Sequence, residues 1–450
     1  MNAQARSGRL LNRKSALERA TAKATWRLVP FLILMYMLSY LDRANIGFAK
    51  QAFQQSTGVS DAAFAFGAGI FFIGYAAFEV PSNLMLHRLG ARVWMARIMV
   101  TWGILAAAMV LARGDTSFSV LRLLLGLAEA GFFPGAILYM TYWFPARSRG
   151  RIMGLFYFGS PLALMFGGPL SGVLLDLDGL FGVEGWQWMF LVEGLLASGV
   201  GVWAYWYLTD RPAEARWLTA EERAALVQAI AAEEKAKEAV GKTGFRAVLT
   251  DPRLLHFAAI YFLIQISGYG VAFYLPTLVS GLVHMKVGVT VGLIAAIPWT
   301  YAIAAAVVWP PLAVRTGCRR SFGIAALLCI GFGLIATGNL APLPAMIALC
   351  FVTMGIICVQ PIFWTFPTGY LGGAAAAGGL AVINAIGNLG GFVAPNVKTW
   401  AEASFASPSA GLYVLASAPL VAAILFALLG GPFVPQRPIN VRPAGASPIV

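Results

Sequence analysis

The chain has 450 residues, of which 59% are hydrophobic and only 11% are charged, and its mean hydropathy is +0.75. This composition is typical of a protein that crosses the membrane many times. The four Cys show neither a disulfide framework nor the spacing of zinc ligands, and the three His are scattered along the chain. No metal site and no cofactor are therefore expected.

The net charge of +13 is spread in a way that indicates membrane orientation and not a nucleic-acid partner. Most Lys and Arg fall in six segments, which are 1–27, 88–97, 147–151, 211–253, 315–320 and the residues after 436. These segments alternate along the chain as the loops on one side of a bilayer do. The positive-inside rule then places both termini in the cytoplasm.

Twelve apolar segments are each long enough to cross about 30 Å of hydrocarbon as a helix. They lie near 28–49, 62–86, 93–112, 117–143, 151–175, 186–208, 254–282, 287–312, 321–340, 343–366, 371–397 and 409–431. The first follows a basic N-terminus, as the core of a signal peptide does. Its length and its lack of a small-residue cleavage site predict an uncleaved span instead.

The chain divides at its one long polar segment, 209–253, where Thr219 and Glu222 have the spacing of a helix capping box. We predict a cytoplasmic segment, a six-helix bundle, a cytoplasmic linker, a second six-helix bundle and a cytoplasmic tail. Their bounds are 1–27, 28–208, 209–253, 254–431 and 432–450. An Arg-x-Gly-x-Arg repeat after the second span (88–92) and after the eighth (315–319) supports two related halves with a site between them.

Four charged residues stand inside the predicted spans of the first half: Asp42, Arg43, Arg122 and Glu129. An ionisable group at membrane depth costs from about 2.5 kcal/mol upward, which makes it a functional hypothesis. An Arg can hold a carboxylate through two hydrogen bonds, and a Glu in a dry setting can load and release a proton. We expect the four side chains to face one water-filled cavity that binds an organic anion and a proton.

Each of these residues also has a structural interpretation. Arg122 or Arg43 could pair with Glu129 simply to fix helix packing. Asp42 and Arg43 could instead reach the outer interface from the end of the first span. Two further acids, Glu79 and Glu193, are expected to be structural, the latter paired with a loop cation.

The second half has no charge within its predicted spans, so we expect it to contact the part of the substrate other than its carboxylate. Its polar candidates are Gln265, Tyr269, Trp364, Asn384 and Asn388. Asn pairs in small-residue helices are also typical of interhelical hydrogen bonds, and contact with ligand and packing stay open as alternatives. Tyr36, Tyr40 and Tyr75 of the first half are candidates to line the same cavity, or to serve packing alone.

The chain resembles the major facilitator superfamily and, within it, the anion:cation symporter family. The motifs that carry the resemblance are Tyr40-Leu41-Asp42-Arg43-Ala44-Asn45-Ile46-Gly47, Glu79-Val80-Pro81-Ser82-Asn83, Arg122-x6-Glu129-Ala130-Gly131-x2-Pro134-Gly135, Trp143-Phe144-Pro145 and Asn384-x3-Asn388-Leu389-Gly390-Gly391. The resemblance implies a twelve-helix fold that works by alternating access and couples an organic anion to a proton, sometimes to sodium. It also implies that Asp42 and Glu129 take protons and that Arg43 and Arg122 bind or gate the anion.

The chain departs from the wider superfamily in the loop after the second span, where Asn83 and His87 replace the usual Gly and Asp. Val314 replaces the acidic residue in the second copy, so a cytoplasmic latch built on these charges is altered. Gly168, Pro169 and Gly172 match the antiporter motif only in part, which does not favour drug efflux. Bacterial members that the chain resembles take up tartrate, phthalate, hydroxyphenylacetate and sugar acids.

We therefore predict an all-α, monomeric transporter in the bacterial inner membrane that imports an organic carboxylate, either an aromatic acid or a small dicarboxylic or sugar acid, with a proton. An exchanger of an organic anion for phosphate is the alternative, because two cavity arginines would also serve it. A membrane-embedded enzyme needs a clustered nucleophile or metal site, and a sensor needs a large signalling domain. The sequence shows neither.

Overall fold

The computed structural model describes residues 15–238, 251–370 and 373–429, and every regular element within these ranges is a helix. The described residues contain twelve helical segments long and apolar enough to cross a membrane, as predicted. The long helices are α2 (Ala16–Thr57), α3 (Asp61–Leu89), α4 (Ala91–Ala107), α5 (Asp115–Glu129), α6 (Phe132–Trp143), α7 (Ala146–Tyr157), α8 (Gly159–Leu175), α9 (Gly185–Tyr207), α10 (Ala220–Glu238), α12 (Pro252–Val283), α13 (Val289–Arg315), α14 (Arg319–Thr337), α15 (Pro342–Tyr370), α16 (Gly373–Asn388), α17 (Gly390–Ser404) and α18 (Pro408–Ala427). Three short 3₁₀ turns, η1 (Ala108–Leu111), η2 (Leu180–Gly182) and η3 (Pro212–Glu214), join them.

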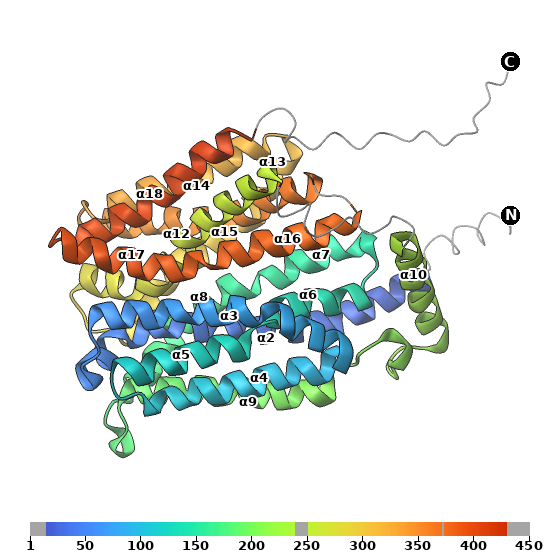
Figure 1. Cartoon of the computed structure of the whole chain (residues 1–450), viewed down its shortest axis with the longest axis horizontal. Helices are drawn as coiled ribbons and strands as arrows, with labels where there is room; N and C mark the ends of the chain where they lie inside the picture. The colour runs from blue at the N-terminus through green and yellow to red at the C-terminus, as the bar shows by residue number, and fades with distance from the viewer. Residues whose placement is uncertain (1–14, 239–250, 371–372, 430–450) are drawn as a thin grey trace, which may run out of the picture.

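The helices α2 to α9 lie together in the lower part of Figure 1, and α12 to α18 lie above them. Helix α10 stands at one end of this assembly, beside the start of α2. We name this end, which contains Ala16 and Pro252, the linker end. The opposite end, where α2 finishes at Thr57 and α12 at Val283, is the far end.

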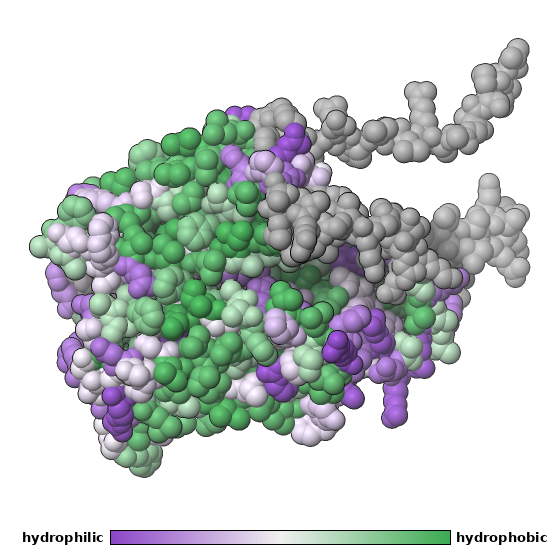
Figure 2. Space-filling model, in the orientation of Figure 1, coloured by the Kyte–Doolittle hydropathy of each residue, from purple (hydrophilic) through white to green (hydrophobic). Residues whose placement is uncertain are grey.

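Apolar side chains cover the flank between the two ends, while hydrophilic residues gather at the ends themselves (Figure 2). Among the described residues, many exposed side chains are large and apolar, for example Val307, Val308, Phe332 and Ile424. Such surface is unfavourable in water and suits contact with lipid tails. The distribution agrees with a chain whose helices cross a bilayer.

The two halves meet closely at the far end. Helix α8 runs against α13 there, and a Cβ on Gly168 would lie 2.7 Å from the carbonyl oxygen of Gly292. The Asp176 carboxylate accepts a 2.9 Å hydrogen bond from the backbone amide of Val289. On the other flank, Asn396 of α17 donates a 3.4 Å hydrogen bond to the carbonyl of Ala65 in α3. These contacts hold the far end closed between the halves.

The fourth span breaks directly after Glu129. Ala130 has an extended backbone (ψ 134°), and Gly131 follows in the left-handed region at φ +86° before α6 begins. Glycine is required there because a Cβ would be strained at this φ and would also clash with the Ser82 side chain. The break leaves Glu129 as the last helical residue of α5.

Helix α10 is attached to the first half through charged contacts. Lys23 and Glu222 form a 2.9 Å ion pair, and Arg19 lies 3.0 Å from Glu221. The predicted capping box is confirmed, since the backbone amides of Thr219 and Glu222 each bond to the side chain of the other residue. The hydrogen bond from Lys23 holds the pKa of the Glu222 carboxyl below its usual range.

Candidate substrate and proton site

All four charged residues singled out in the first half are buried. Asp42 and Arg43 of α2 are 4% and 6% exposed, and Arg122 and Glu129 of α5 are fully buried. They lie among the helices of the first half and at its contact with the second. The alternative in which Asp42 and Arg43 reach the outer interface is therefore wrong.

Arg43 and Glu129 form the central ion pair. The Arg43 Nε donates a 2.8 Å hydrogen bond to Glu129 Oε1, and its Nη2 lies 2.7 Å from the same oxygen. The Ser39 hydroxyl donates to this oxygen as well, at 2.6 Å. The second oxygen, Glu129 Oε2, is buried and has no hydrogen-bond partner among the described residues. This carboxylate is thus held at one oxygen and left free at the other.

The Arg43 side chain also joins the two halves. Its guanidinium lies 4.8 Å from the ring centre of Tyr75 in α3. Its Nη1 donates to the Tyr269 hydroxyl in α12 at 3.4 Å, and this hydroxyl donates to Asn388 Oδ1 in α16 at 3.4 Å. Tyr75, Tyr269 and Asn388, three residues predicted to bind substrate, therefore lie around one cation.

Arg122 is held differently. Its Nε and Nη2 each donate a 3.4 Å hydrogen bond to a backbone carbonyl of α3, those of Gly67 and Ala68. Its guanidinium lies 4.9 Å from the ring centre of Phe71, and its Nη1 has no hydrogen-bond partner among the described residues. Although Arg122 and Glu129 are two turns apart on one helix, no ion pair joins them. Arg122 is a buried cation with an unused donor.

Asp42 points to a second cluster, formed with α8 and α9. Asn45 Nδ2 donates to Asp42 Oδ1 at 3.3 Å and to Glu193 Oε2 at 2.9 Å, and Ser171 donates to Glu193 Oε1 at 2.8 Å. The expected partner of Glu193, a loop cation, is therefore wrong. Instead of one network, the four charges divide between the Arg43–Glu129 pair, the Asp42 cluster and Arg122. Electrostatic interactions still connect Asp42 with Glu129, Arg122 and Arg43.

The remaining candidates have different partners, and one of them, Asn384, contacts the other half. Asn384 donates a 3.2 Å hydrogen bond to Glu79, so Glu79 takes part in a contact between the halves. Gln265 accepts a 3.4 Å bond from Gln360. Two partly exposed aromatic candidates, Tyr40 and Trp364, pack against Tyr36 and Tyr261 respectively.

The second half contains a buried cation that sequence reasoning missed. Lys398 is 6% exposed in α17, lies 2.6 Å from Glu402, and stands 3.8 Å from the ring centre of Tyr274. Lys50 of the first half lies 5.5 Å from the same ring. The predicted eleventh span ended at 397, whereas the helix continues to Ser404, which brings Lys398 inside it. A cavity of about 280 Å³ adjoins this group at the far end.

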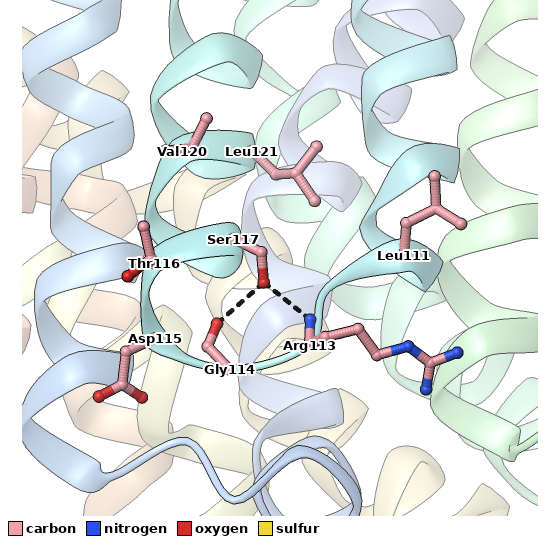
Figure 3. A pocket seen from close by; sticks show the side chains of 8 residues that line it. All are labelled: Leu111, Arg113, Gly114, Asp115, Thr116, Ser117, Val120 and Leu121. Carbon is pink, nitrogen blue, oxygen red and sulfur yellow. Dashed lines mark hydrogen bonds between the residues drawn. The ribbon is translucent and has the colours of Figure 1, made fainter.

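A second hollow, of about 630 Å³, lies at the turn between η1 and α5 (Figure 3). Ser117 faces it, but its hydroxyl already makes two hydrogen bonds within the turn. It accepts one from the Arg113 amide at 2.7 Å and donates one to the Gly114 carbonyl at 3.1 Å. None of the residues that line it belongs to the charged clusters. This surface therefore contributes nothing to the candidate site.

Twelve membrane-length helices that enclose buried charged side chains are typical of a polytopic membrane transporter. Residues 32–395 match the model of the Major Facilitator Superfamily. The chain belongs to this superfamily.

Curated relatives are transporters that match over most of their length. The chain is 45% identical over 409 residues to the "Inner membrane transport protein RhmT" of Escherichia coli, covering 91% of this chain and 95% of that protein. It is 45% identical over 414 residues to a "Putative tartrate transporter" of Agrobacterium vitis, covering 91% of each. Among solved structures, the D-xylose-proton symporter has a TM-score of 0.71 at 15% identity, covering 91% of this chain and 99% of that one. This last likeness concerns the fold alone.

Proposed function

We propose that this transporter is an anion:cation symporter that imports an organic carboxylate together with a proton. The observation that carries the proposal is the Arg43–Glu129 pair, a buried cation held by a carboxylate that a proton can neutralise. The pair lies at the contact between the halves, because Arg43 bonds through Tyr269 to Asn388. Alternating access requires the load to sit at such a contact.

Protonation of Glu129 would remove the charge that holds Arg43. The guanidinium would then be free to take the substrate carboxylate through two hydrogen bonds, which is the strongest arrangement available to it. Arg122, with its unused Nη1, would serve as the second cation, and Asp42 would take a second proton. Tyr40, Tyr75, Gln265, Trp364 and Asn384 would contact the rest of the substrate.

The orientation in the membrane that we propose rests on the charge distribution. The basic loops lie at the linker end, and the positive-inside rule favours the cytoplasm on that side. The closed far end would then face outward, and the described conformation would be shut to the outside. Opening the far end requires separating α8 from α13 and α3 from α17. In that step Tyr274, which now lies beside lysines of both halves, would part from Lys50.

A small dicarboxylic or sugar acid is the substrate class that the relatives named as tartrate transporters favour. The polar and uncharged side chains of the second half suit the hydroxyl groups of such an acid. The partly exposed aromatic side chains of Trp364 and Tyr40 favour an aromatic acid as the second choice. We further propose a monomer in the bacterial inner membrane, with folding units at 28–208 and 254–431.

An exchanger of an organic anion for phosphate is the alternative, favoured by the second buried cation, Arg122. Vesicles that contain the purified protein and no internal substrate separate the two. With acid buffer outside, a symporter accumulates labelled tartrate in the empty vesicles. An obligate exchanger takes up label only when tartrate or phosphate is present inside.

A further inference from the structure

We propose that Asp42 and Glu193 form a single proton-holding carboxyl pair, joined through Asn45, and that Glu193 is a coupling residue of the transporter. The inference rests on the proposed symport. It adds a residue on α9 that neither the central ion pair nor the family motifs include.

The geometry defines one compact cluster of three helices. The Asn45 amide of α2 stands between the two acids and donates to both, at 3.3 Å to Asp42 and 2.9 Å to Glu193. Ser171 of α8 closes the cluster with its 2.8 Å bond to Glu193. Asp42 and Glu193 are 4% and 3% exposed, and Asn45 and Ser171 are fully buried.

The charges of this cluster do not balance when both acids are ionised. Glu129 has Arg43 within 2.7 Å, but no Lys or Arg among the described residues lies within salt-bridge distance of Asp42 or Glu193. The charged groups around Asp42 are Arg43 beside it on α2, and Arg122 and Glu129 on α5, while α9 supplies only Glu193. Two neighbouring buried carboxylates without a cation are strongly unfavourable, and one shared proton removes half of that charge.

The hydrogen-bond count favours an added proton independently. The cluster contains five acceptor oxygens on Asp42, Asn45 and Glu193, but Asn45 and Ser171 supply only three hydrogens. Two acceptors, Asp42 Oδ2 and Asn45 Oδ1, are buried and have no partner among the described residues. A proton on Asp42 would turn one of these acceptors into a donor.

The same geometry favours a proton over a sodium ion. A metal ion between two carboxylates needs oxygen atoms turned toward it from several directions. Here the space between the acids is taken by the Asn45 nitrogen, whose hydrogens point at both carboxylates. That arrangement repels a cation at the centre and leaves protonation as the way to reduce the charge.

The position of the cluster links its protonation state to the contact at the far end. Ser171 lies three residues after Gly168, where α8 meets α13 of the other half. Losing or gaining a proton changes the attraction among α2, α8 and α9, and therefore the position of α8 at that contact. Protonation of the Asp42–Glu193 pair would thus affect how the two halves close against each other.

Infrared difference spectroscopy of the purified protein in vesicles, between alkaline and acid buffer, tests the proposal. A protonated carboxylic acid has its own carbonyl-stretching band. We expect one band that disappears in Asp42→Asn and also in Glu193→Gln, because neutralising either acid removes the charge repulsion that keeps one proton on the pair. A band unchanged by Glu193→Gln, in protein with an unaltered melting temperature, would overturn the proposal.

Ser171→Ala keeps both acids and provides a milder variant. Removing a donor to the ionised form of Glu193 should move the midpoint of the band toward more alkaline pH. The matched control is Glu402→Gln, an acid of the other half that should leave the band in place. An unmoved midpoint in Ser171→Ala, or a band abolished by sodium chloride but not by choline chloride, would contradict the proposal.

The band is measured without substrate, so its result stands apart from the direction of transport. If the vesicle assay reveals an obligate exchanger while the shared band persists, the proposed symport fails and the carboxyl pair remains. If symport holds and the band does not depend on Glu193, the pair alone fails.

Discussion

The two halves share a fold but differ in what they bury. The first half encloses Asp42, Arg43, Arg122, Glu129 and Glu193, whereas the buried charge of α17 in the second half, Lys398, lies close to the far end. Around Arg43 the second half contributes only neutral groups, the Tyr269 hydroxyl and the Asn388 amide. The difference indicates that one half performs the charge chemistry while the other completes the binding surface.

Their two ion pairs differ in burial in a way that can be measured. In the Arg43–Glu129 pair the carboxylate side chain is fully buried, but in the Lys398–Glu402 pair it is 27% exposed. Water can therefore solvate Glu402 when its partner is lost, but not Glu129. The same deletion should then have unequal costs in the two halves.

The largest effect is expected for Arg43→Met, which leaves Glu129 as an unpaired buried charge. The free energy of unfolding should fall by about 3–5 kcal/mol, and transport should be lost. Lys398→Met should lower it by less than half as much. Adding Glu129→Gln to Arg43→Met should restore most of the stability without restoring transport, as measured by thermal unfolding in detergent. Equal losses in the two halves would contradict the comparison.

The contact between the halves provides a second test. Gly292→Val places a branched side chain against the Gly168 carbonyl, so the far end should no longer close. A Cys at Asn396, in protein without its native Cys, should then react several times faster with an impermeant thiol reagent. Gly199→Val is the control, since a side chain there meets no neighbour. An unchanged rate in Gly292→Val would show that this contact does not control closure.

A smaller effect on transport is expected from changing a side chain of the second half that contributes to substrate binding. Asn388→Ala removes one neutral hydrogen bond of 3.4 Å, so substrate affinity should weaken by about 1 kcal/mol, roughly fivefold. Proton coupling should be retained because no charge changes. Binding of tartrate by calorimetry measures the affinity, and loss of coupling in this variant would contradict the division of roles.

The smallest effect is expected outside the membrane, at α10. The pKa of Glu222 is lower in the folded protein than in the unfolded chain, so its contribution is present above its ordinary pKa and is lost as pH falls through the folded value. Lys23 is about half exposed, which limits the contribution to less than about 1 kcal/mol. The protection factors of the α10 amides, which are corrected for the intrinsic exchange rate, should therefore fall in acid, and Glu222→Gln should flatten that dependence.

Much of the fold follows from the sequence because spanning helices need long apolar runs. The twelve spans and the capping box at Thr219 were both predictable from local residues. The partner of each buried charge could not be predicted. The residues between Asp42 and Glu193 do not determine how α2 and α9 are rotated against each other. Lys398 was missed for a local reason, since the end of an apolar run is not the end of a helix.

Glu129 tests the central claim most directly. Glu129→Gln imitates the protonated acid, so Arg43 should be free to bind the substrate at every pH. We expect vesicles with this variant to lose accumulation of labelled tartrate under an acid-outside gradient but to keep tartrate–tartrate counterflow. Accumulation that survives in Glu129→Gln would contradict the account.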